Sequence, residues 1–517
     1  MNMTAWQDAF RRVPELLAAH VQLSFSALLL AMVICFPLAI WATRNTRVAG
    51  VILGFASLIQ TIPALALLAL FYPVLLGLSA LLGGGISALG FLPALMALTL
   101  YALLPILRNA VTGLTGVSPA ARQAADGLGM TASQKLRLVE APLAAPTIMA
   151  GIRTAAVWTI GAATLSTTVG QASLGDLIFA GLQTQNWTLV LTGCLASAGL
   201  AIVVDIILGV IERAIRDRRK MVAWSGTAAI AAGLLFALLP SLQSSEDDVV
   251  VIGAKGFSEQ FILARLIGSR LEAAGYQVRY RDALGSAVVF QAVAAGDIDV
   301  YVDYSGTIWT NQMKRDDRIV SEQMIEEISS WSEQQHGVTT LGALGFENTY
   351  AFAVRPEDAE GRSLRTLDDL ALISSEFVFG TDLEFLERPE WATVRQAYPL
   401  AFREARSFNP TFMYPALSSG EVDVISAFSS DGRIAANGFV VLEDNKGAIP
   451  SYEAIVLLAP DRGTDQKLRS ALKPLVGRIT VENMREANYK VDRETDKQSP
   501  AQAASWLDDI IRKGDGQ

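Results

Sequence analysis

The chain has few of the residues from which proteins build covalent or metal-bound frameworks. Among 517 residues there are two cysteines, Cys35 and Cys194, and two histidines, His20 and His336. Both cysteines lie inside apolar runs, which argues against a disulfide framework. The histidines are isolated, and no metal-ligand spacing surrounds them. A G-x-x-x-x-G-K-[ST] phosphate loop is also missing from the sequence, so we expect no cofactor in this chain and no ATP-binding site of its own.

Charge is missing from a long stretch, because no charged residue occurs between Arg47 and Arg108. Residues 1–245 hold 14 Lys/Arg and 8 Asp/Glu, whereas the rest holds 28 and 43. The chain is 51% apolar with a mean hydropathy of +0.35, which is too apolar for an ordinary soluble protein. The acidic second half argues against nucleic acid, because phosphate binding needs a basic surface.

The apolar runs predict six membrane spans, since one span needs about 20 mostly apolar residues. Basic residues cluster after the first span, between the third and fourth, and between the fifth and sixth. These loops should face the cytoplasm, and everything after about residue 245 should lie outside. We expect a membrane domain at 1–220, and a sixth span with its linker at 221–246 that tethers the acidic half. The predicted spans are 21–43, 50–76, 88–107, 146–170, 187–211 and 222–241.

The predicted cytoplasmic loop 118–146 has clear helix signals. Ser118 can cap a first helix, with a proline at the next position and glycines at its end. Thr131 and Gln134 have the spacing of a capping box for a second helix, and Pro142 is expected to close it. Two short helices joined by a glycine turn would make a rigid knob.

The "QAADGLG" and "VEAP" segments of this loop resemble the coupling loop of ABC-importer permeases, and "QTIPALALLAL" resembles a span of their glycine betaine and choline branch. Gln123 stands where that family usually has glutamate. The resemblance implies a type I importer permease whose knob docks on a separate ATPase, which is homodimeric, and it implies self-association of two chains through their spans in the lipid. The residues that match the family's coupling motif are Gln123, Ala124, Ala125, Gly129 and Pro142.

The acidic half alternates strand and helix patterns from residue 247 onward, which predicts parallel sheets with helices on both faces. "AVAAGDIDVYVDYSG" (292–306) aligns without gaps with "ALSSGEVDVISAFSS" (416–430). We therefore expect two similar α/β lobes. Lobe 1 would comprise about 247–350 and 451–517, and lobe 2 about 351–450.

Aromatic residues fall where these lobes should face each other, because ligands bind beyond the carboxyl ends of parallel strands. Tyr304 and Phe428 occupy equivalent strand ends, and Tyr350 and Tyr452 fall at the crossovers between lobes. Aromatic faces can hold a quaternary ammonium, which has no N–H to donate. Polar groups would bind the other end of the ligand, and the candidates are Gln260, Thr307, Asn348 and Ser429. Asp303 and Asp431 could add negative potential. Either aspartate could instead cap a turn.

Segments such as "GAKGFSEQ", "GFENTY" and "IPSYE" resemble the substrate-binding proteins of osmoprotectant importers. The resemblance implies a type II periplasmic-binding-protein fold outside the inner membrane, with an aromatic cage for glycine betaine, choline or carnitine. Relatives with the same fused architecture import ergothioneine, so another trimethylated betaine stays open. The whole chain would then be a multidomain membrane protein, an all-α permease followed by its binding domain.

Other classes of function fit the sequence less well. A membrane-anchored sensory receptor needs a cytoplasmic signalling domain, and the longest inside loop is the coupling knob. A ligand-gated channel usually interrupts its lobes with pore segments, whereas here all predicted spans precede them. An enzyme is least favoured, because no nucleophile–base pair or metal cluster is evident in the sequence.

Overall fold

The computed structural model describes residues 3–82, 88–183, 186–217, 219–243, 249–315, 317, 319–382, 384–408, 410–493 and 495–514. The chain divides into two compact units. The first comprises Met1–Phe179 and Trp187–Ser245, and the second comprises Ala180–Asn186 and Glu246–Gln517. The end of the predicted linker, 244–246, lies outside the described residues.

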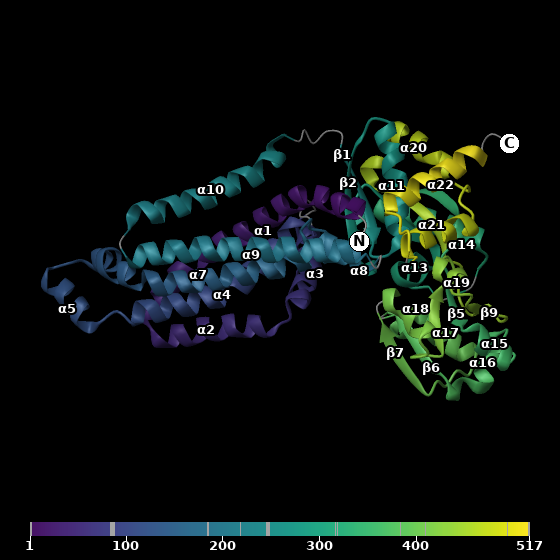
Figure 1. Ribbon diagram of the computed structural model, residues 1–517, viewed down its shortest axis with the longest axis horizontal. Helices are drawn as coiled ribbons and strands as arrows, with labels where there is room; N and C mark the ends of the chain where they lie inside the picture. Colours follow the sequence, from purple (N-terminus) through teal and green to yellow (C-terminus); the bar gives the residue numbers. More distant parts are fainter. Residues whose placement is uncertain are drawn as a thin grey trace. The chain divides into compact units, whose positions relative to one another are not determined.

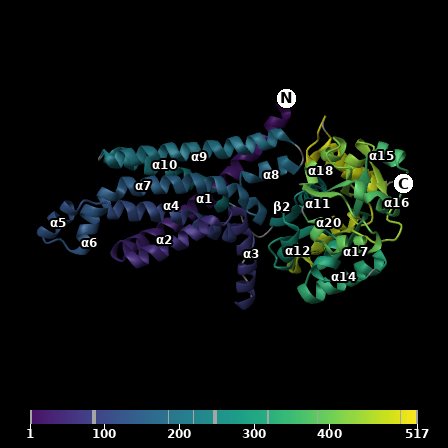
Figure 2. The same ribbon diagram turned by 90° about the horizontal axis from the view of Figure 1, so that it is seen from below.

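The first unit is helical throughout its described residues. α4, α7 and α9 run side by side (Figures 1 and 2), and α1 packs on α4. Small and branched apolar residues such as Ala102, Ile106 and Ala155 fill the shared core, which lets the helices approach closely. The helices are α1 (Met3–Arg44), α2 (Thr46–Thr61), α3 (Ala64–Leu81), α4 (Phe91–Thr115), α5 (Pro119–Gly127), α6 (Ala132–Lys135), α7 (Ala141–Ala163), α8 (Gly175–Gln183), α9 (Trp187–Arg216) and α10 (Lys220–Gln243).

Four helices are long and apolar enough to cross a membrane, namely Ala9–Arg44, Phe91–Thr115, Ala132–Val169 and Trp187–Arg216. They correspond to the first, third, fourth and fifth predicted spans. The sixth predicted span falls in α10, whose apolar stretch Trp224–Leu235 is shorter. The described part of the chain therefore carries four such helices, or five if α2 and α3 form one span, where the sequence predicted six.

The second predicted span, 50–76, falls on two helices with a sharp bend between them. α2 ends at Thr61, and it meets α3 at an angle of 102°. Pro63 lies at the break. A proline has no backbone N–H and keeps the residue before it out of the helical region, and Ile62 is accordingly extended.

The loop 118–146 forms two helices, as predicted. The Ser118 hydroxyl accepts a hydrogen bond from the Ala121 N–H at 3.2 Å and begins α5. Thr131 and Gln134 form the expected capping box of α6. An ion pair of 2.6 Å between Lys135 and Asp126 joins the two helices, so the knob is held together by its own side chains.

Pro142 does not close the second helix, contrary to the prediction. The chain continues from α6 through a π-helical segment, Leu136–Glu140, directly into α7, and Pro142 lies in the first turn of α7. A proline is tolerated there because its missing N–H falls where the regular hydrogen-bond pattern is already interrupted. The knob is therefore continuous with a membrane helix.

An ionic network joins α7 to α9 within the helical unit. The Arg153 guanidinium forms ion pairs with Asp205 at 2.7 Å and with Glu212 at 3.1 Å. Gly209 makes room for it, because a Cβ at that position would lie 3.2 Å from Arg153 Cζ. Charged residues inside a membrane are costly unless they are paired, so this pairing explains how α7 tolerates an arginine.

Two five-stranded sheets form the second unit, in the orders β2-β1-β3-β10-β4 and β7-β6-β8-β5-β9. In each sheet the fourth strand in the order is antiparallel to both neighbours, and the other pairs are parallel. The expected parallel sheets are therefore mixed, because β5 and β10 follow the two crossovers between the lobes. The strands are β1 (Val249–Lys255), β2 (Gln277–Leu284), β3 (Val300–Tyr304), β4 (Thr339–Glu347), β5 (Tyr350–Val354), β6 (Val378–Asp382), β7 (Glu404–Phe408), β8 (Val424–Phe428), β9 (Val440–Leu442) and β10 (Glu453–Leu458).

The topology confirms that the two aligned segments, 292–306 and 416–430, belong to similar lobes, since β3 and β8 occupy the same place in the two strand orders. The matched aspartates before these strands make the same kind of hydrogen bond. Asp299 accepts a hydrogen bond from the Val251 N–H of β1 at 2.7 Å, and Asp423 accepts one from the Val378 N–H of β6 at 2.8 Å. The repeated Asp-Val pair therefore anchors each central strand to its parallel neighbour.

Helices cover both sheets. α11, α21 and α22 pack together in lobe 1 (Figure 1). α21 also approaches the start of α19 very closely, because a Cβ at Gly432 would lie 2.5 Å from Tyr489 Cβ. The helices of this unit are α11 (Ser258–Ala273), α12 (Ser286–Ala294), α13 (Ser305–Thr307), α14 (Ser321–His336), α15 (Pro356–Gly361), α16 (Leu367–Ile373), α17 (Pro389–Ala397), α18 (Pro410–Ser418), α19 (Gly432–Ala436), α20 (Gln466–Leu472), α21 (Val481–Asp492) and α22 (Pro500–Gly514).

Candidate functional site

Three of the four predicted cage aromatics lie together. Tyr350 and Phe428 are register partners on β5 and β8, and their ring centroids are 5.0 Å apart. Tyr452 meets Tyr350 edge-on at 6.1 Å, and Phe385, which the sequence did not point to, packs on Tyr350 at 4.6 Å. Tyr304 instead stacks on Phe257 at 6.3 Å. That Tyr304 and Phe428 meet across one cleft and close on a cation from two sides stays a prediction.

A cation of the chain itself lies against this aromatic group. The Arg388 guanidinium lies 5.4 Å from the Tyr350 ring centroid, and it donates to the Tyr452 hydroxyl at 3.2 Å. Arg388 also forms an ion pair with Glu390 at 3.0 Å. Burial raises the pKa of Tyr350 and of Tyr452 well above the usual value, so both remain neutral rings. These aromatic rings therefore accommodate a positive charge beside them.

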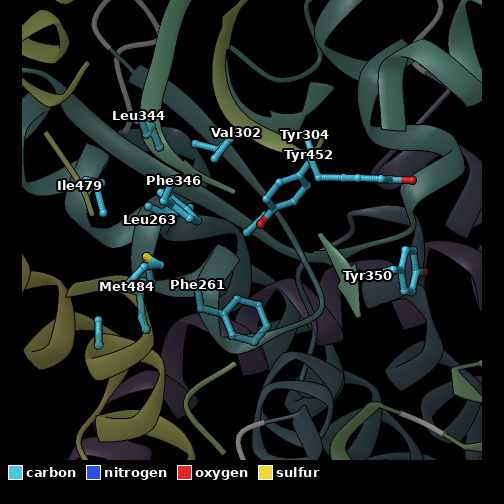
Figure 3. Close-up of a cluster of buried hydrophobic side chains, with 14 of the residues drawn as sticks. Phe261, Leu263, Val302, Tyr304, Leu344, Phe346, Tyr350, Tyr452, Ile479 and Met484 are labelled. Atoms are coloured by element: carbon cyan, nitrogen blue, oxygen red, sulfur yellow. The ribbon is translucent and has the colours of Figure 1, made fainter. Parts of the chain in front are cut away.

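A buried carboxylate, Glu259, organises the polar part of the site. It lies in the first turn of α11 and is 2% exposed. It accepts hydrogen bonds from the Tyr304 hydroxyl at 2.5 Å and from the amides of Asn348 and Asn488 at 3.0 Å each. Burial raises the pKa of Glu259, although these donors favour its ionised form. Figure 3 shows Tyr304, Tyr350 and Tyr452 beside the buried residues of the same core.

A small cavity of about 90 Å³ lies next to Glu259. It combines two aromatic rings with three acidic side chains and one basic one. Its lining residues are Gly256, Phe257, Ser258, Glu259, Asn348, Phe428, Ser430, Asp431, Arg433, Asn488 and Asp492.

The acidic residues of the cavity are held in place by hydrogen bonds. Arg433 forms an ion pair with Asp431 at 2.6 Å, and the Ser258 hydroxyl donates to Asp492 at 2.5 Å. Burial raises the pKa of Asp492 to about 6, although Arg433 opposes this shift. Because carboxyl groups outnumber the guanidinium, the lining favours a cationic ligand.

Of the predicted substrate contacts, Phe428, Asn348 and Asp431 line the cavity, and Tyr304 reaches it through Glu259. Asp303 lies on the opposite face of β3 from Tyr304, because successive side chains of a strand alternate. There it forms a buried ion pair with Lys255 at 2.9 Å. Through this ion pair Asp303 joins β3 to the end of β1 in lobe 1.

Three other predicted polar contacts lie outside the cavity lining. Gln260 binds the Val302 carbonyl and the Tyr304 hydroxyl, both at 3.0 Å. The Ser429 hydroxyl accepts a hydrogen bond from the Thr349 N–H at 2.9 Å. Thr307 is buried in α13. None of these three is among the residues that line the described cavity.

The residues matched to the coupling motif lie in the knob of the helical unit. Gln123 and Ala124 are exposed on α5, whereas Ala125 is 2% exposed. Gly129 has a φ of +70°, which favours glycine. Pro142 is exposed at the start of α7.

Several residues of the site were not predicted from the sequence. Glu259 lies next to the candidate Gln260, and its place in the first turn of a helix that follows a buried strand was the available signal. Asn488 and Asp492 are one turn apart on α21, more than 150 residues after β3. No local motif marks them, because their role depends on where α21 packs.

Two sequence families match the chain. Residues 248–509 match the family described as the substrate binding domain of ABC-type glycine betaine transport system, and residues 35–217 match that of the binding-protein-dependent transport system inner membrane component.

Curated relatives cover the same two regions. The ergothioneine transport permease/ergothioneine binding protein EgtU of Helicobacter pylori (strain G27) is 30% identical over 493 residues, which cover 91% of this chain and 85% of that protein. The choline transport system permease protein OpuBB of Bacillus subtilis (strain 168) is 42% identical over 194 residues, 38% of this chain and 84% of that protein. A solved structure titled as a glycine betaine/carnitine/choline ABC transporter is 27% identical with a TM-score of 0.45, and covers 52% of this chain and 98% of that one.

Proposed function

Because this chain belongs to the family of ABC-importer permeases that carry a fused substrate-binding domain of the glycine betaine type, we propose that it captures a small quaternary ammonium compound in the cavity beside Phe428 and Glu259. The chain is a multi-pass inner-membrane transporter subunit whose binding domain is extracytoplasmic. We assign the membrane part to residues 1–220 with the tether at 221–246, and the binding domain to 247–517.

The observation that carries this proposal is the combination of Phe428 and Phe257 with three acidic side chains in one cavity. A trimethylammonium group has no N–H, so hydrogen bonds cannot recognise it. An aromatic face attracts it by roughly 0.5–2 kcal/mol per contact, and carboxylates add favourable potential. The Tyr350 ring packs on Phe428, the Tyr452 ring meets Tyr350, and the Arg388 guanidinium lies over Tyr350, so positive charge is already accommodated next to the cavity lining.

The cavity size favours a small ligand or a small group of one. About 90 Å³ is well below the roughly 300–1,000 Å³ of pockets for drug-sized molecules. Choline, glycine betaine, carnitine and ergothioneine, which the names of relatives mention, are the candidates. The two lobes would open and close around the ligand, as two-lobed binding proteins do by hinge motion.

Import of the captured ligand requires an ATPase as a partner. We propose that this ATPase is a separate homodimer, that it docks on the knob at 118–146, and that two copies of the chain pair through their membrane helices. The continuity of the knob with α7 through Leu136–Glu140 supports this proposal, because movement of the knob would reach the membrane without a flexible break.

Isothermal titration calorimetry on the full-length chain in detergent tests the binding site. We expect at least one of choline, glycine betaine, carnitine, proline betaine and ergothioneine to bind, and Phe428→Leu to weaken that binding at least tenfold. Phe412→Leu is the matched control, since Phe412 is exposed on α18 of the same lobe. Binding of none of the five, or equal affinity in Phe428→Leu, contradicts the proposed site.

A further inference from the structure

Two residues of the cavity lining each carry a buried amide oxygen that has no hydrogen-bond partner among the described residues. These oxygens are Asn348 Oδ1 and Asn488 Oδ1. Both residues line the cavity, and they are 7% and 4% exposed. A buried polar atom without a partner costs about 1–3 kcal/mol. Two such atoms on residues that line one cavity therefore indicate that something else pairs with them.

Glu259 fixes the orientation of both amides. Each asparagine turns its N–H₂ group toward the Glu259 carboxyl, at 3.0 Å in both cases. The Asn488 N–H₂ also donates to the Ser430 carbonyl at 3.0 Å, which a flipped amide could not do. The two amide oxygens are therefore held as acceptors on the side away from Glu259.

The remaining charges of the cavity disfavour an anionic group at this end. Glu259, Asp431 and Asp492 all line it, and the basic residue, Arg433, already donates to both oxygens of Asp431, at 2.9 and 2.6 Å. A ligand carboxylate here would meet three carboxyl groups and two amide oxygens. A neutral hydroxyl or ring N–H would instead complete the hydrogen bonding.

Resting on the proposed function, we infer that the ligand is a quaternary ammonium compound that also carries a neutral O–H or N–H donor, and that Asn348 and Asn488 accept hydrogen bonds from this donor. The class includes hydroxylated ammonium alcohols and trimethylated betaines with an azole N–H. A betaine whose only other polar group is a carboxylate fits the cavity less well.

The test compares choline with propyltrimethylammonium, in which a methyl group replaces the hydroxyl at nearly the same volume. Both are titrated into the full-length chain in detergent by calorimetry, together with 3,3-dimethylbutan-1-ol, which keeps the hydroxyl and lacks the charge. Sites built to hydrogen-bond a ligand donor reject analogues that lack it. We expect choline to bind at least tenfold more tightly than propyltrimethylammonium, and the uncharged alcohol to bind more weakly than choline.

Variants of the two asparagines test whether they cause the preference for choline over propyltrimethylammonium. Asn348→Ala and Asn488→Ala should each reduce the ratio of the two affinities to about threefold or less. Asn483→Ala, on the same helix as Asn488 but outside the cavity lining, should leave the ratio unchanged. The wild-type comparison does not depend on the folding of any variant.

The outcomes separate the two proposals. Equal affinity for choline and propyltrimethylammonium in the wild type overturns the inference and leaves the cation site intact. A preference for choline that persists in both asparagine variants also overturns it. If neither trimethylammonium compound binds, this inference fails, and the proposed function fails only if none of the five ligands named above binds.

Discussion

The Tyr304 hydroxyl donates a hydrogen bond to the Glu259 carboxylate at 2.5 Å, and the two side chains are only 4% and 2% exposed. The contact joins the end of β3 to the first turn of α11. Tyr304 therefore acts on the cavity through Glu259, which in turn holds Asn348 and Asn488. A residue that resembles a cage aromatic in the sequence is here part of a hydrogen-bonded wall.

Replacing Tyr304 by phenylalanine tests this role. Tyr304→Phe keeps the ring and removes one donor to a buried carboxylate, which should lower the free energy of unfolding by about 1–3 kcal/mol. Ligand affinity should fall about tenfold, because Glu259 orients the two amides. Tyr398→Phe is the control, since the Tyr398 hydroxyl donates to Asp444 at 2.5 Å away from the cavity. Unchanged ligand affinity in Tyr304→Phe would show that this hydrogen bond has no role in binding.

Gly306, two residues after Tyr304, packs closely against the Tyr452 ring. A Cβ at Gly306 would lie 2.6 Å from Tyr452 Cε2 and 2.8 Å from the Ser451 carbonyl oxygen. Gly306→Ala should therefore destabilise the protein by about 1–3 kcal/mol through overpacking, and it should weaken ligand binding by moving Tyr452. Thermal unfolding and calorimetry measure the two effects. Gly361→Ala has open space around its Cβ, and equal behaviour of the two variants would be evidence against close packing at Gly306.

The pH dependence of stability should reflect Asp492. Burial raises the pKa of Asp492 in the folded chain to about 6, above about 3.9 for an unperturbed aspartate. Protonated Asp492 therefore contributes to the free energy of unfolding. This contribution is fully present below about pH 4 and is lost as the pH rises through 6, by up to roughly 3 kcal/mol. Without ligand, the melting temperature should therefore fall between pH 5 and pH 7.

Asp492→Asn should reduce this fall, because an amide does not titrate and its oxygen can still accept the Ser258 hydroxyl. Asp509→Asn, an exposed substitution on α22, should leave the fall in melting temperature unchanged. A slope with pH that is identical in wild type and Asp492→Asn would remove Asp492 as its source.

The knob predicts a separation of binding from transport. Ala125 is buried in α5, so Ala125→Phe must distort the knob. We expect loss of ATP-dependent uptake with unchanged ligand affinity, because the binding domain is a separate compact unit. Ala172→Phe places the same bulk at an exposed position of the helical unit. Full uptake in Ala125→Phe would contradict the coupling role of the knob.

Local signals in the sequence predicted many elements of this structure. Ser118, Thr131 and Gln134 act as helix caps because capping depends only on nearby residues. The gapless echo around Asp299 and Asp423 predicted two similar lobes because both aspartates repeat one backbone contact. These are interactions whose partners a short window of sequence contains or repeats.

One local irregularity and several long-range contacts account for the features that the sequence did not predict. Pro142 was expected to end a helix, and a π-helical segment before it lets the helix continue. Asp303 was a candidate ligand contact, and its partner Lys255 is 48 residues away. Asn488 reaches Glu259 across 229 residues. Only the folded arrangement brings such groups together.

Transport in a reconstituted system shows directly whether one chain both captures and imports the ligand. Proteoliposomes would contain only this chain and its partner ATPase, with a radiolabelled trimethylammonium ligand on the side of the membrane where the binding domain lies. We expect ATP-dependent accumulation of the ligand without any added binding protein. Accumulation that begins only after a separate binding protein is supplied would show that the fused domain is not the receptor.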